Sequence, residues 1–239
     1  LVLPWSAGKE VRLTGEQWRS GRGYRVARAR LDADDVAAWL DFPTTTVPRT
    51  LVDCAREWSQ LDSVIAMDDA LQRRLVTRAE LRNAVLAARH RPGVAAAARA
   101  FNLSDGRAES PLETKGRLRL LAAGLPLPEL QVELHGEHGF LGRIDAWYES
   151  AAVAIEFDGQ VKYADPIGGR TPAEVLWEEK RREDGIRGVD VRLVRIVNED
   201  FGSRWPHVVG RLRDLVATPY AGRRRFRVVR RPEPGSAAA

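Results

Sequence analysis

The sequence predicts an α/β protein in which a mixed β-sheet flanked by helices follows a small, mainly helical region. Residues 32–101 place apolar side chains three and four positions apart, which is typical of helices. Residues 110–217 instead give the order helix, three strands, helix, strand, helix, which indicates a sheet covered on both faces. The polar stretch SDGRAE at 104–109 separates them. We therefore expect a helical region over residues 1–104, an α/β domain over 105–218 and a basic C-terminal tail over 219–239.

The composition favours a folded, soluble protein. The 239 residues are 44% hydrophobic and 30% charged, which is enough apolar material for a buried core. No run approaches the roughly 18 apolar residues of a membrane helix, and the first ten residues lack a signal-peptide pattern. We expect a cytoplasmic location and no membrane partner. Because the chain begins at Leu1 rather than Met, its N-terminal region is a candidate for truncation.

The N-terminal region begins with short β-favouring pieces, EVRLTG and GYRVARARL, and then becomes helical. The expected helices are DADDVAAWL, VPRTLVDCAREW, SQLDSVIAMDDALQRRL, TRAELRNAVLAARH and GVAAAARAF. Thr77 and Glu80 have the spacing of a capping box. The lone Cys54 excludes an internal disulfide and a zinc site built on several thiolates, and its helical setting predicts a buried structural thiol. We expect this region to serve packing or partner contact.

The α/β region opens with a helix over SPLETKGRLRLLAAGL and continues with strands over LPELQVELHG, FLGRIDAWY and AAVAIEFDG. A polar loop, a helix around VLWEEKRREDGIRG, the strand VRLVRIV and a helix near RWPHVVGRLRDLVA follow. His135 and His138 in HGEHGF have a short spacing between glycines, which favours a hairpin turn over a zinc site.

Three carboxylates lie in or beside this apolar strand pattern. Glu156 and Asp158 are two positions apart on one strand and so point to the same face, and a hairpin through YESA would bring Asp145 across from them. Like charges so placed repel unless arginines or a cation neutralise them. Their oxygens suit Mg²⁺ or Mn²⁺, which could activate water for phosphodiester hydrolysis. The alternative is that Glu156 and Asp158 only end a strand and pair with Arg143 or Lys162.

Several segments together resemble a known family. They resemble, in chain order, actinobacterial proteins with a domain similar to the very-short-patch-repair endonucleases of the PD-(D/E)XK, or restriction-endonuclease-like, superfamily. The segments are SPLETKGRLRLLAAGLPLPELQVEL, GRIDAWY, VAIEFDGQVKY, VLWEEKRRED and VRLVRI. The helical stretch from PTTTVPRTLVDCAREW through TRAELRNAV resembles the region ahead of this domain in abortive-infection-type antitoxins. The resemblance implies a restriction-endonuclease-like sheet over the α/β region.

The resemblance also implies a metal site. By position, Asp145 matches the first Asp of the motif and Glu156 its (D/E), and these would hold Mg²⁺ or Mn²⁺. Asp158 stands where the motif has Lys, and an aspartate cannot supply that positive charge. Lys162 or Lys180 could supply it instead, with Asp158 as a third ligand or an orienter of water. If neither lysine reaches the acids, the core would bind without cutting.

Glu113 has two interpretations. Ser110, Pro111 and Glu113 fit the first positions of a capped helix. SPLE also resembles the start of the first helix in many of these nucleases, where a glutamate faces the metal site. The two roles are compatible, because a helix N-terminus can direct its first-turn carboxylate toward a neighbouring site.

The basic residues suggest a polyanion partner. Lys and Arg number 38 against 33 acids. Arg182 is three residues after Glu179, so it either pairs on the helix surface or contacts a phosphate near the acids, as Lys180 also could. The segment GRRRFRVVRR is either a solvated tail or a phosphate-contacting arm. Its arginines are Arg223, Arg224, Arg225, Arg227, Arg230 and Arg231.

These patterns favour a metal-dependent DNA endonuclease in DNA repair or phage defence, with a repair partner or a cognate toxin as a further partner. The alternative is a catalytically inactive, nuclease-like antitoxin or DNA-binding transcriptional regulator. A third option is a protein-interaction module built on the helices. The alternatives differ in whether a lysine amine reaches Asp145 and Glu156.

Overall fold

The computed structural model describes residues 10–39, 41–159 and 171–234. The chain divides into two compact units, the first comprising Leu1–Gly106 and Glu233–Ala239 and the second Arg107–Pro232. The division falls within SDGRAE. The chain returns to the first unit at Glu233, whose Oε1 accepts a hydrogen bond from the Gly106 amide at 2.9 Å and lies 3.3 Å from Arg78 Nη1. No helix in the described residues is both long and apolar enough to cross a membrane.

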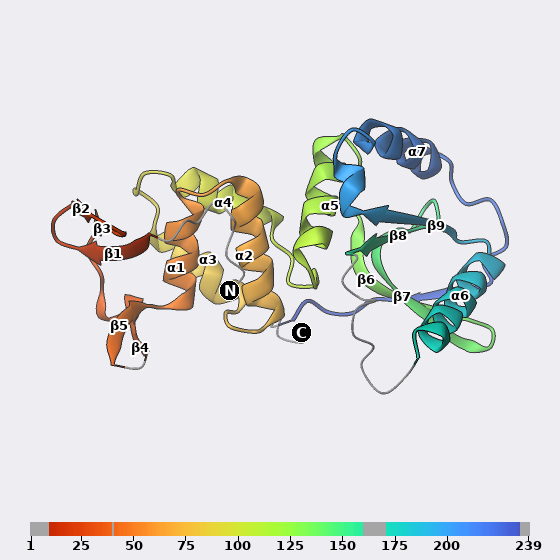
Figure 1. The fold of residues 1–239 in the computed structure, drawn as a ribbon, viewed down its shortest axis with the longest axis horizontal. Helices are drawn as coiled ribbons and strands as arrows, with labels where there is room; N and C mark the ends of the chain where they lie inside the picture. The colour runs from red at the N-terminus through yellow and green to blue at the C-terminus, as the bar shows by residue number, and fades with distance from the viewer. Residues whose placement is uncertain (1–9, 40, 160–170, 235–239) are drawn as a thin grey trace. The chain divides into compact units, whose positions relative to one another are not determined.

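The first unit begins with two small sheets (Figure 1). Strands β1 (Val11–Gly15), β2 (Arg19–Gly21) and β3 (Tyr24–Arg28) form one in the order β1-β3-β2, and β4 (Val36–Trp39) pairs with β5 (Phe42–Thr45) in the other. The prediction of a helix over DADDVAAWL is wrong. A short 3₁₀ turn over Ala33–Asp35 leads into β4 instead, because β5, which contains Pro43, is extended and offers a strand partner.

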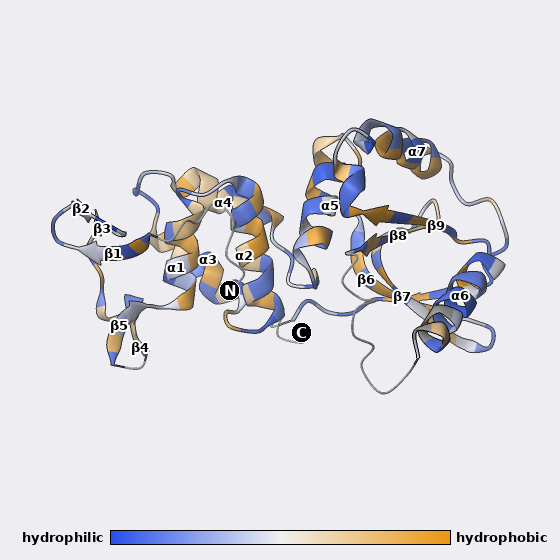
Figure 2. Cartoon of the chain, in the orientation of Figure 1, coloured by the Kyte–Doolittle hydropathy of each residue, from blue (hydrophilic) through white to orange (hydrophobic). Residues whose placement is uncertain are grey.

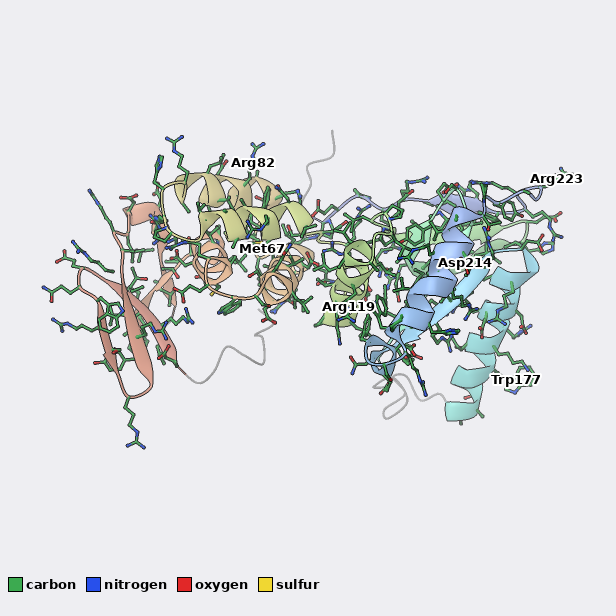
Figure 3. The ribbon with its side chains drawn as sticks, turned by 90° about the horizontal axis from the view of Figure 1, so that it is seen from above. Met67, Arg82, Arg119, Trp177, Asp214 and Arg223 are labelled. Atoms are coloured by element: carbon green, nitrogen blue, oxygen red, sulfur yellow. The ribbon has the colours of Figure 1, made fainter. Side chains whose placement is uncertain are left out.

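Four helices complete the first unit: α1 (Val47–Ala55), α2 (Gln60–Gln72), α3 (Arg78–Ala87) and α4 (Val94–Leu103). The predicted capping box at the start of α3 is present, with Thr77 and Glu80 exchanging hydrogen bonds. The core between the helices includes Met67, labelled in Figure 3, and Leu71, both fully buried. Cys54 is half-buried, and burial raises the pKa of its thiol to about 11, so it stays protonated.

The second unit is built on a mixed five-stranded sheet, which confirms the α/β prediction. Its strands are β6 (Glu129–Gly136), β7 (Gly139–Tyr148), β8 (Val153–Asp158), β9 (Arg192–Val197) and β10 (Arg227–Val229), in the order β10-β6-β7-β8-β9. All neighbours are antiparallel except β8 and β9, which are parallel.

Helices cover both faces of this sheet (Figure 1). Helices α5 (Pro111–Ala122) and α7 (Trp205–Ala217) bury Leu120 and Leu212 in one core, together with Ile155 and Phe157 of β8. Helix α6 (Pro172–Gly188) buries Ile186 in the core on the other face. Figure 2 shows mostly hydrophilic residues along α6, whereas α7 has a hydrophobic and a hydrophilic side. Among the α6 side chains that the structure describes, most are exposed or half-buried and so available for polar interactions.

Part of the expected basic tail belongs to the sheet. Strand β10 pairs with β6, and Phe226 is 9% exposed and packs edge-on against Trp147 with 5.8 Å between ring centroids. Val228 packs against the same core. The apolar residues within GRRRFRVVRR therefore fix the segment to the second unit as a strand.

Candidate functional site

A cavity of about 560 Å³ opens beside β7, β8 and α6, and the three predicted carboxylates all line it. Its described lining is mostly charged, with only Phe140, Gly142 and Phe157 as uncharged members. The acidic residues are Glu133, Asp145, Glu156, Asp158, Glu178 and Glu179, and the basic ones are Arg143, Arg182, Arg195 and Arg231. Among the described lining residues, six acids against four arginines leave a formal charge of −2, which is equal in size to the charge of one divalent cation.

Asp145 lies where β7 and β8 stop pairing. The paired positions end with Ala146 opposite Ile155. Beyond them, Asp145 Oδ2 accepts the backbone N–H of Phe157 at 2.8 Å, so a side chain takes the place of a backbone acceptor. Asp145 Oδ1 accepts a second hydrogen bond from Gln131 Nε2 at 3.3 Å. These two bonds fix the carboxylate at the edge of the cavity.

Glu113 is 6% exposed at the start of α5 and accepts three hydrogen bonds. The donors are the Glu109 amide at 2.9 Å, Ser110 Oγ at 2.8 Å and Gln131 Nε2 at 2.9 Å. Burial raises the pKa of Glu113, and the nearby charge of Asp145 raises it further. Ser110 Oγ in turn accepts the Glu113 amide, which is the predicted helix cap. Glu113 therefore caps α5 and also lies beside Asp145.

Gln131 joins these two acids, and the sequence does not predict this role. Its Nε2 donates to both carboxylates, whereas its buried Oε1 has no hydrogen-bond partner in the described structure. Its φ of 52° is left-handed, a conformation that costs a residue with a Cβ roughly 1–2 kcal/mol. The only sequence signal was a carboxamide between Leu130 and Val132 in an apolar strand.

Glu156 is neutralised by two arginines. Arg182 Nη1 lies 2.6 Å from Glu156 Oε1, and Arg195 Nη2 lies 3.3 Å from Oε2. Glu179 contacts the same two arginines, at 2.6 Å from Arg182 Nη2 and 2.8 Å from Arg195 Nη2. We call these four residues the arginine–glutamate quartet. The predicted alternative partner Arg143 pairs instead with Glu109 at 2.7 Å.

The backbone explains how the two arginines reach Glu156. Arg195 is the register partner of Glu156 on the parallel strand β9. Arg182 extends from α6 across Gly142, where a Cβ would lie 3.2 Å from its Nη1. The sequence predicts Arg182 as a phosphate contact but does not reveal Arg195, because the β8–β9 register is not visible in a single sequence.

Neither candidate lysine is seen at the acids. Lys162 lies outside the described residues. Lys180 is exposed on α6, and its amine is 6.0 Å from the ring centroid of Trp177, which projects from the helix away from the sheet (Figure 3). No lysine is among the described residues that line the cavity. Among the described residues, arginines therefore provide the positive charge of the cavity lining.

In this structure the three predicted carboxylates are not drawn together as a group of metal ligands. Across residues 10–39, 41–159 and 171–234, no three or more His, Cys, Asp or Glu side chains are grouped so that they could hold a metal ion. Asp145, Glu156 and Asp158 line one cavity without forming such a group. Their oxygens still suit Mg²⁺ or Mn²⁺ chemically, but Glu156 would have to exchange arginine contacts for the ion.

Most arginines of the expected arm are paired with acids of the second unit. Arg225 Nη2 lies 2.9 Å from Asp190 Oδ2, Arg230 Nε 2.5 Å from Glu129 Oε2, and Arg231 Nε 2.6 Å from Glu133 Oε1, while Arg224 pairs with Glu149. Arg223 and Arg227 are exposed and form no ion pair with another described residue. Figure 3 shows Arg223 at the outer edge of the second unit.

Two proteins of Mycobacterium tuberculosis are similar to this chain. They are named "Uncharacterized protein MT2308" and "Uncharacterized protein Rv2248", and each is 34% identical over 151 residues, which cover 63% of this chain and 53% of the relative. Neither name assigns an activity. The chain thus spans about half the length of the curated relatives it matches. No family model matches the sequence, and no solved structure matches it at a significant level.

Proposed function

We propose that the second unit is a metal-dependent endonuclease that hydrolyses phosphodiester bonds of DNA, in DNA repair or phage defence. The supporting observation is the cavity in which Asp145 and Glu156, from neighbouring strands, are accompanied by arginines. A phosphodiester brings one negative charge to a cavity whose described lining already has two more negative than positive charges. A divalent cation would remove that repulsion, and the arginines would then contact phosphate oxygens.

Asp145 and Glu156 would hold Mg²⁺ or Mn²⁺, with Asp158 as a third oxygen donor. A bound ion would polarise the phosphate and make a water molecule bound to it more acidic. Gln131 orients Asp145 through its hydrogen bond at 3.3 Å, and the Phe157 amide fixes the other carboxylate oxygen. The chain's own contribution is thus a carboxylate whose position is set before any ligand arrives.

A second candidate function is DNA binding without cleavage, as in a transcriptional regulator or an antitoxin that meets a cognate toxin. Two observations favour it. Asp158 brings a negative charge where the resembled motif has lysine, and Glu156 is already neutralised by Arg182 and Arg195. In that case the quartet would be a structural substitute for the metal.

The test is incubation of the whole chain with supercoiled, linear, mismatched and single-stranded DNA, in Mg²⁺, Mn²⁺ or EDTA. Endonuclease activity predicts cleavage that requires the ion and that Asp145→Asn and Glu156→Gln each abolish without loss of folding. Asp190→Asn is the matched control, because Asp190 is exposed, ion-paired and outside the cavity lining.

The result separates the two candidates. Binding of DNA with no cleavage in any condition would replace the endonuclease with the DNA-binding function. Neither binding nor cleavage of any of the four DNA forms would contradict both.

A further inference from the structure

The arginine–glutamate quartet is held together unevenly. Arg182 donates Nε at 3.0 Å and Nη2 at 2.6 Å to the two oxygens of Glu179, a bidentate contact that leaves Nη1 for Glu156. Arg195 uses Nη2 for both of its contacts, at 2.8 Å to Glu179 and at 3.3 Å to Glu156. Glu179 therefore makes two contacts with Arg182 where Glu156 makes one, and it lies closer than Glu156 to Arg195. Loss of the Glu156 contact would leave both arginines in place.

A cation bound by Glu156 would cause that loss. The Glu156 side chain is 9% exposed, so its charge requires a partner, and an incoming divalent ion can replace the arginines in that role. Arg182 Nη1 and Arg195 Nη2 would then lose their ion-pair contact with Glu156 beside the cavity. The arginine with the more exposed side chain is Arg195, at 33% against 25% for Arg182.

Asp158 makes a local positive charge necessary. Asp158 lies two residues after Glu156, on the same side of β8. It lines the cavity and adds a negative charge there. Negative charge develops on the phosphate oxygens during hydrolysis, so a nearby donor that stabilises it accelerates the reaction. Arg195 is the register partner of Glu156 on β9 and lines the same cavity as Asp158.

We propose that Arg195 is a catalytic residue that leaves Glu156 when the cation binds and donates to the phosphate oxygens at the scissile bond, with Glu179 as the residue that positions it. The inference rests on the endonuclease function proposed above. In the reaction a water oxygen bonds to phosphorus, the bond to the leaving oxygen breaks, and the water's proton passes through solvent to that oxygen. Arg195 stabilises charge and transfers no proton.

The test measures single-turnover DNA cleavage in Mn²⁺, together with DNA affinity, for Arg195→Gln, Arg195→Lys and the double variant Arg195→Gln/Asp158→Lys. Removing one donor to a developing oxyanion typically costs about 100-fold or more in rate, so Arg195→Gln should lose about that much. Arg195→Lys should retain an intermediate rate. The double variant should regain activity, because it restores a positive charge at the next position on the same face of β8.

Arg187→Gln is the matched control, since Arg187 lies on α6 and pairs with Glu183 on the exposed helix surface, outside the cavity lining. Cleavage by Arg195→Gln within about threefold of the wild type would overturn the proposal. The proposal would also be overturned if the cleavage rate of Arg195→Gln decreased only in proportion to its DNA affinity and if adding Asp158→Lys did not restore that rate. If Arg195→Gln fails to fold, full activity of Arg195→Lys with an unchanged dependence on Mn²⁺ would overturn it. A wild type that binds DNA but never cuts contradicts the endonuclease function itself, which is a different outcome from any variant result.

Discussion

Replacement of Glu113 should separate its structural role from its charge. Glu113→Ala removes the acceptor of the Glu109 amide, of Ser110 Oγ and of Gln131 Nε2. Ser110 can turn toward another acceptor and Gln131 Nε2 keeps its bond to Asp145, so the Glu109 amide is the donor left without an acceptor, and the free energy of unfolding should decrease by about 1–3 kcal/mol. At about 4 °C for each kcal/mol, the melting temperature of the second unit should decrease by about 4–12 °C.

Glu113→Gln should behave differently, because its carboxamide keeps an acceptor oxygen and can donate to Ser110 Oγ. We expect a change within about 1 kcal/mol near neutral pH. The pH dependence has a definite sign. Burial and the charge of Asp145 raise the pKa of Glu113 above its ordinary value of 4.5. The contribution of this group to the stability of the wild type is therefore fully present below pH 4.5 and is lost as the pH rises through the raised pKa. Relative to the wild type, Glu113→Gln should therefore gain stability above pH 4.5.

Calorimetry of the whole chain between pH 4 and pH 8 measures both effects. Asp145→Asn is the informative companion, because it removes the neighbouring charge and should reduce the pH-dependent difference between the Glu and Gln forms. Two results would refute the reasoning. One is a Glu113→Ala variant as stable as the wild type, and the other is a Gln variant whose stability difference from the wild type does not change with pH.

Two further predictions concern packing and charge. Gly116→Ala should destabilise the second unit by about 1–3 kcal/mol, because a Cβ there would overlap the Phe157 ring. Thermal melting should show this loss, and adding Phe157→Leu should recover part of it. An unaffected melting temperature would contradict the close contact between α5 and β8. Arg223→Ala and Arg227→Ala should leave melting unchanged, because neither arginine pairs with another described residue, and each should reduce the salt slope of duplex DNA binding by about 0.9 if it contacts a phosphate. Unchanged slopes in fluorescence-anisotropy titrations would remove both residues from the DNA surface.

The sequence predicted the parts of the second unit that depend on local pattern. Apolar alternation placed β6, β7 and β8, and the two-residue spacing put Glu156 and Asp158 on the side of the strand opposite Phe157. Helix α5 begins where Ser110 and Pro111 predicted, because capping chemistry is encoded within four residues.

The partners of the acids depend on long-range register and were not predictable in this way. Arg195 meets Glu156 only because β9 pairs in parallel with β8 at one particular offset. Gln131 bridges Glu113 and Asp145 only because its backbone adopts a left-handed conformation that its residue type does not favour. The prediction of a helix over DADDVAAWL was wrong because it rested on the spacing of the apolar residues. The residues before Pro43 favour an extended backbone instead, and β5 then pairs with β4.

The return of the chain at Glu233 has a practical consequence. Because Glu233 Oε1 lies 2.9 Å from the Gly106 amide, the second unit starts and finishes at nearly the same point in space. Such a unit can be joined end to end with a short linker and opened elsewhere. A circular permutant of residues 107–232 could be opened at an exposed turn such as the one between β6 and β7. A fluorophore or fusion partner attached there would lie next to Phe140 and the cavity. Every strand pairing would be preserved except the one that closes this hairpin.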